Sequence, residues 1–239
     1  MSAIYKKEMK VYLNTLPCYI FLSSFLLIGG LWFSSRNILD KETDFMPVIN
    51  ALSYAILILT PLLTMKLIAT EHESKTDRLI ITAPIKTRSI VMGKYFAALT
   101  VFFIALSITL LFPLLLSALG TPSWPGVFTG YLGLVLFGAT LIAAGLFISS
   151  LMRKTLVAGF TTLAVMLFIL LFDELLPHIV NPSAHMILSK LTPISNELYF
   201  MKGFISPAAI LYFLSVTFML LFMTVRMMEH RKWSKGRCL

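Results

Sequence analysis

Charged residues are scarce in this sequence, and several long apolar stretches contain none. Charged residues make up 13% of the 239 residues, whereas hydrophobic residues make up 58%. A soluble domain usually has about 25% charged residues. Because the apolar residues form unbroken runs and not amphipathic stripes, the composition argues against a water-soluble domain and indicates a protein that spans a lipid bilayer.

The residue patterns of common catalytic and metal sites are also missing. Glu71-His72-Glu73 resembles part of a zinc-protease motif but lacks a second histidine at helical spacing. His178 and His185 have no supporting cysteine or carboxylate, and Ser149-Ser150 has no histidine partner in neighbouring apolar stretches. No G-x-x-x-x-G-K-[ST] phosphate loop occurs. We therefore expect no catalytic residue, no metal and no cofactor in this chain, which cannot hydrolyse ATP alone.

Uncharged stretches long enough to cross a bilayer occur six times. A bilayer core about 30 Å thick needs about 20 helical residues. Between Tyr95 and Met152 lie 58 uncharged residues, too many for one helix, and the prolines and glycines of Gly120–Gly126 divide them. We predict an all-α polytopic membrane protein, a single domain over 1–239, with spans at about 16–35, 45–68, 94–118, 127–151, 155–173 and 207–226.

The distribution of lysine and arginine indicates the orientation of these spans. Cytoplasmic segments of membrane proteins carry an excess of both residues. With both termini in the cytoplasm, sixteen basic residues fall inside and four outside, namely Arg36, Lys41, Lys190 and Lys202. We expect a multi-pass protein of the cell (inner) membrane with cytoplasmic termini. This bias also accounts for the net charge of +9, so we expect no nucleic-acid binding.

The N-terminal segment has an amphipathic helical pattern. Over residues 4–16, apolar side chains share one helical face, with lysines on the other. This pattern predicts an interfacial elbow helix along the inner leaflet, whose basic residues face anionic headgroups. The basic residues of this elbow are Lys6, Lys7 and Lys10.

A second long segment, Asp173 to Pro207, lies on the predicted outer side. Its length and its own apolar positions predict a structure folded over the outer mouth. Asp173 and Glu174 are candidate outer-mouth residues. They would favour cationic groups, although acids at a span boundary are equally an ordinary feature.

The predicted cytoplasmic loop after span two is the most informative part of the sequence. Thr76 or Asp77 can cap a short helix that Pro84 ends. The helix would carry the apolar patch Leu79-Ile80-Ile81 between charged flanks. A solvated loop is the alternative, but the patch favours a docking surface for a cytoplasmic protein.

Glycines recur along span four, so that helix has no side chains at several positions. They are Gly126, Gly130, Gly133, Gly138 and Gly145. Small residues let a second helix approach closely. We favour tight helix packing over a role in substrate gating.

Local motifs along the whole chain match one family. They include Ile4-Tyr5-Lys6-Lys7-Glu8, Thr82-Ala83-Pro84-Ile85, Pro193-Ile194-Ser195 and Arg231-Lys232-Trp233. The chain resembles the ABC-2 class of ABC transporter permeases, particularly the gliding-motility-associated branch. The resemblance implies six spans, an N-terminal elbow helix, a coupling helix between spans two and three, and an outer helical segment between spans five and six.

The resemblance also implies a function and partners. The chain would be the permease subunit of an ATP-driven exporter, paired with a second copy or a homologous permease. ABC ATPase subunits would bind ATP and Mg, and an accessory outer subunit is a further candidate partner. The implied ATPase-coupling residues are Glu71, Glu73, Thr76, Asp77, Arg78, Leu79, Ile80 and Pro84.

Two other functions are weaker alternatives. The chain could anchor an ATPase-containing complex without transporting a substrate. An intramembrane enzyme is disfavoured because catalytic groups are missing from the spans. Apolar and aromatic side chains with scattered serine and threonine are compatible with a peptide, a lipid or an amphipathic drug as substrate.

Overall fold

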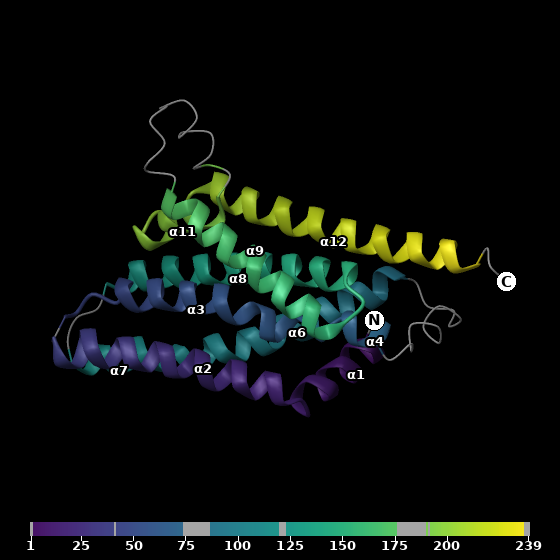
Figure 1. Ribbon diagram of the computed structural model, residues 1–239. Helices are drawn as coiled ribbons and strands as arrows, with labels where there is room; N and C mark the ends of the chain where they lie inside the picture. Colours follow the sequence, from purple (N-terminus) through teal and green to yellow (C-terminus); the bar gives the residue numbers. More distant parts are fainter. Residues whose placement is uncertain are drawn as a thin grey trace.

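The computed structural model describes residues 2–40, 42–73, 87–119, 123–175, 190 and 192–236. These residues form helices and no strand (Figure 1). The elements in chain order are α1 (Ser2–Leu13), α2 (Leu16–Phe33), the π-helix η1 (Ser34–Leu39), α3 (Met46–Thr64), α4 (Ala69–Glu73), α6 (Thr87–Thr109), α7 (Leu111–Leu119), α8 (Trp124–Leu151), α9 (Thr155–Leu175), α11 (Pro193–Met201) and α12 (Pro207–Gly236).

Six of the described helical stretches are long and apolar enough to cross a membrane. They are Leu16–Leu39, Met46–Thr64, Thr87–Ala118, Trp124–Leu151, Thr155–Leu175 and Pro207–His230. This result confirms the all-α polytopic membrane fold. The helix α1 precedes the first stretch, and α11 lies between the last two.

Prolines mark the helix boundaries. They occupy the first turn of α2, α3, α8 and α11, where a missing N–H costs nothing. The third span is interrupted between Thr109 and Leu111. Pro113 explains the interruption, because it cannot donate a hydrogen bond to the carbonyl of Thr109. Of the predicted break at Gly120–Gly126, Ser123 precedes α8, whereas Trp124, Pro125 and Gly126 form its first turn; residues 120–122 lie outside the described residues.

The centre of the bundle is formed by α3 and α8. Of the most apolar window of each of these helices, 67% is buried, against 17% for α9. Large aromatic side chains fill the space around them and are almost fully buried: Phe21, Phe25, Phe45, Phe102, Phe137, Phe200 and Phe213. The peripheral α9 leaves many apolar side chains uncovered, including Leu156, Phe160 and Phe168.

The bundle has two distinct ends (Figure 1). At one end lie α1, α4, the turn between α8 and α9, and the last part of α12; we call it the α1 end. At the other lie η1, the start of α3 and α11; we call it the α11 end.

Glycines of α8 bring this helix into contact with its neighbours. A Cβ atom at Gly138 would overlap the Phe102 ring, and one at Gly145 would overlap the Thr64 side chain. The close packing predicted for the fourth span is therefore confirmed.

Substitution of Gly138 by alanine is expected to lower the free energy of unfolding by about 1–3 kcal/mol, because overpacking forces side chains off their rotamers. The fully buried Phe102 has little room to move. Thermal unfolding in detergent micelles would measure the effect. The matched control is Gly30→Ala, whose new methyl would meet only one atom, at 4.0 Å; equal stability of the two variants would contradict the packing argument.

Candidate functional site

A buried ion pair joins three elements at the α1 end. The Lys94 ammonium of α6 lies 3.2 Å from the Glu8 carboxylate of α1 and donates a 2.6 Å hydrogen bond to the carbonyl of Leu67, just after α3. The two charged side chains are only 2% and 10% exposed. A buried charge needs a partner of opposite sign, so this contact fixes α1 against α6 and the end of α3.

Further contacts hold α1 in the same place. The Tyr12 hydroxyl donates to the carbonyl of Leu63 at 2.9 Å, and the Tyr5 hydroxyl lies 3.0 Å from the Thr100 hydroxyl. Gly93 of α6 allows the side chain of Ile4 to approach closely. The elbow lysines Lys6, Lys7 and Lys10 are exposed on the opposite side of α1.

The short helix α4 is attached to the end of α8 and to the start of α9. The backbone N–H groups of Ile68 and Ala69 donate to the Ser149 hydroxyl at 3.2 and 3.1 Å. At the other end of α4, the Glu73 carboxylate accepts the backbone N–H of Thr155 at 3.0 Å. Thr155 begins α9, so the carboxylate satisfies one of the free N–H groups at that helix start.

The environment of Glu73 favours its charged form. Hydrogen bonding to the side chain and the backbone N–H of Thr155 lowers the pKa of Glu73, and nearby Lys154 acts in the same direction. Glu73 is therefore an anion at neutral pH, which suits a position beside the positive end of the α9 dipole.

At the α11 end, the short helix α11 is held by two acids. The Ser195 hydroxyl donates to the Asp173 carboxylate at the end of α9, at 2.8 Å. The Ser53 hydroxyl of α3 donates to the Glu197 carboxyl at 2.5 Å. Glu197 is 1% exposed, and in the described part of the chain it forms no salt bridge with a basic residue.

Burial controls the ionisation of Glu197. Loss of water around the carboxyl raises the pKa of Glu197 to about 8, and the hydrogen bond from Ser53 offsets only part of this effect. Glu197 is therefore held mainly as the neutral acid at neutral pH.

Comparison of the sequence with protein families shows which family this membrane protein belongs to. The sequence profile described as ABC-2 family transporter protein matches residues 33–195, which are 163 of the 239 residues. The chain belongs to the ABC-2 family of transporter proteins. No curated protein matches the sequence. An ABC-2 membrane domain is a transporter component that is not itself catalytic, and membership implies association with an ABC ATPase subunit.

The family match supports the permease class but not a branch within it. The gliding-motility assignment stays a prediction. The matched range contains Glu73, Lys94 and Ser149, whereas Glu8 and Glu197 lie outside it.

The structure describes only some of the predicted ATPase-coupling residues of this permease. Glu73 is placed at the junction of α4 and α9, and Glu71 lies in α4 with a side chain outside the described set. The remaining coupling candidates lie outside the described residues, namely Thr76, Asp77, Arg78, Leu79, Ile80 and Pro84. The coupling assignment as a whole stays a prediction.

The outer-mouth candidates have different surroundings. Asp173 is partly buried and accepts the hydrogen bond from Ser195, so it holds α11 in place. Glu174 is exposed. Among the described residues of the permease, no group of three histidine, cysteine or acidic side chains could hold a metal ion.

Sequence reasoning missed the two most deeply buried acids. Glu8 lies between Tyr5 and Tyr12 on the apolar stripe of α1, and that position was the available signal that it would be buried. Lys94 immediately precedes the long uncharged stretch, so its ammonium had to enter the bundle or bend toward water. For Glu197 we find no comparable sequence signal.

Proposed function

We propose that this chain is the membrane-spanning subunit of an ATP-driven exporter, and that a separate ABC ATPase acts on it through the segment between α4 and α6. Residues 71–84 contain the coupling candidates. The observation that carries the proposal is the attachment of α4, whose start is hydrogen-bonded to Ser149 near the end of α8 and whose last residue, Glu73, is hydrogen-bonded to Thr155 at the start of α9.

Two sets of contacts would transmit a movement of α4 and of the end of α3 to the membrane-spanning helices. Through Glu73, a shift of α4 acts on the start of α9. Through Leu67 and Lys94, a shift at the end of α3 acts on α6 and on α1. A loop without such contacts could move without displacing the spans.

The complete transporter in this proposal has two permease chains, identical or related, and two ATPases that bind ATP and Mg. The uncovered apolar side chains of α9 are suited to contact with a second permease or with lipid. In this proposal the chain lies in the inner membrane with its α1 end facing the cytoplasm, and the excess of basic residues at that end supports this orientation. An accessory subunit would bind at the outer, α11 end.

Substitution of Glu73 by alanine is expected to reduce ATPase-driven transport by roughly fivefold, the lower end of typical coupling between sites. The backbone N–H group of Thr155 loses its acceptor, so a movement of α4 is no longer transmitted to α9. Transport and ATP hydrolysis would be measured in proteoliposomes that contain the permease with its ATPase subunit, and ATPase binding should be retained.

The matched control is Glu42→Ala, which removes an exposed acid from the turn before α3. Transport and hydrolysis by the Glu73 variant at the level of the control would contradict the coupling role. A wild-type complex whose hydrolysis never responds to substrate would instead favour a membrane anchor without transport.

A further inference from the structure

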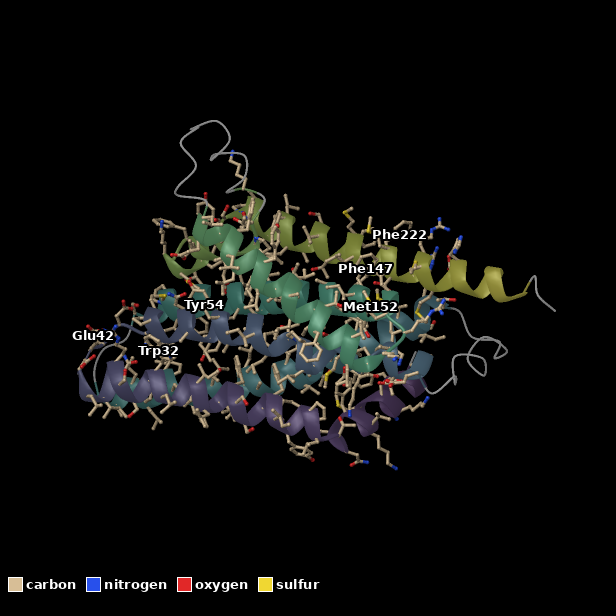
Figure 2. All side chains as sticks on the ribbon, viewed as in Figure 1. Trp32, Glu42, Tyr54, Phe147, Met152 and Phe222 are labelled. Carbon is tan, nitrogen blue, oxygen red and sulfur yellow. The ribbon has the colours of Figure 1, made fainter. Side chains whose placement is uncertain are left out.

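A groove opens between α8 and α12 at the α1 end of the bundle. Its volume is about 670 Å³, within the usual range for ligand sites. Figure 2 labels Phe147 and Phe222, which line it from α8 and α12 respectively. Both helices are candidate membrane spans, so the groove borders the part of the bundle that faces the bilayer.

The walls of the groove are apolar and adaptable. Leu151 lines it from α8, and Met223 and Met227 line it from α12. Methionine side chains have flexible, polarizable ends that fit irregular shapes. Leu151 is 37% exposed and Met223 is 40% exposed, so the walls are open to an occupant. These surfaces suit a hydrocarbon chain.

One end of the groove carries a cation. The Arg226 guanidinium lies 5.2 Å from the centre of the Phe222 ring and 3.7 Å from the Glu229 carboxylate. Its side chain is 66% exposed. A guanidinium has five N–H donors in a planar fork that matches phosphate oxygens, and the ion pair with Glu229 uses only part of this capacity.

Two further basic residues lie at the α1 end of the bundle, just after the α8 wall of the groove. Arg153 and Lys154 are exposed in the turn that follows α8. With Arg226, these are three cations, and the acids described near them are Glu229 and Glu73. The groove therefore joins an apolar channel to an end that carries the Arg226 guanidinium.

We propose that this groove binds an anionic phospholipid of the adjacent leaflet, with an acyl chain along α8 and α12 and the phosphate at Arg226. A membrane lipid already has the depth and orientation that the groove requires. Basic residues near a membrane surface each attract anionic lipid by about 1 kcal/mol. The site is independent of the proposed ATPase coupling and requires no partner protein.

The test is lipid binding by the purified full-length chain, measured by native mass spectrometry with phosphatidylglycerol or phosphatidylcholine of identical acyl chains. The wild-type chain should retain phosphatidylglycerol preferentially. Arg226→Gln should reduce that preference about fivefold. Met223→Trp, which fills the groove, should reduce retention of both lipids.

The matched control is Arg36→Gln at the α11 end. Arg36 also lies over an aromatic ring, Trp32, and also pairs with an acid, Asp40, at 3.8 Å. Equal effects of the two arginine substitutions, or equal retention of the two lipids by the wild-type chain, would overturn the proposal. Loss of a permease dimer in Met223→Trp without loss of lipid would also overturn it, because a second copy would then be the occupant.

Discussion

Substitution of Lys94 by methionine is expected to lower the free energy of unfolding by about 3–5 kcal/mol. The change leaves the Glu8 carboxylate buried without its cation and removes the donor to the Leu67 carbonyl. Both losses are costly, because a buried polar group without a partner keeps its full desolvation penalty. Chemical or thermal unfolding in detergent micelles would measure the difference.

Two comparisons make this expectation specific. Lys66→Met removes an exposed lysine near the same end of α3 and should cost little. The double variant Glu8→Leu/Lys94→Met should recover much of the lost stability, since replacing both members of a buried pair is often nearly neutral. A single Lys94 variant as stable as the Lys66 variant would contradict the assigned role of the ion pair.

The stability of the permease is expected to fall as the pH rises from about 4.5 to about 8, and substitution of Glu197 by glutamine should remove this dependence. Burial raises the pKa of Glu197 from 4.5 to about 8 in the folded chain, so the folded state holds the proton more tightly than the unfolded state. The stabilisation is fully present below about pH 4.5 and is lost as the pH passes through about 8.

The expected change is large. Each pH unit within that interval costs up to about 1.4 kcal/mol, which amounts to a total on the order of 5 kcal/mol. Unfolding would be followed in detergent micelles between pH 5 and pH 9. Glutamine keeps the neutral, hydrogen-bonding form of the side chain and should give a flatter profile, whereas Glu42→Gln should retain the wild-type slope. A slope unaffected by Glu197→Gln would assign the dependence to other groups.

The membrane fold was predictable because a bilayer imposes simple rules. A span needs about 20 uncharged residues, and such runs are visible directly in the sequence. The break between α7 and α8 was equally visible from the prolines and glycines near Gly120. The amphipathic pattern of α1 predicted which side carries Lys6 and Lys10, and these lysines are exposed.

The buried polar contacts were not predictable in the same way. Glu8 and Lys94 are 86 residues apart, and their pairing depends on how α1 packs against α6. Glu197 belongs to a segment that reads as an outer loop, and its burial follows from the packing of α11 against α3 and α8. Periodicity within one helix contains no information about which distant helix covers it.

The hydrogen bonds at the two ends of α9 have a mechanical consequence. Thr155 is attached to α4 through Glu73, and Asp173 is attached to α11 through Ser195. A helix of 21 residues is about 32 Å long and stiff along its axis. It packs along one side against α3 and α8, and only 17% of its most apolar window is buried. We therefore expect an axial displacement at Glu73 to be transmitted along α9 towards Ser195.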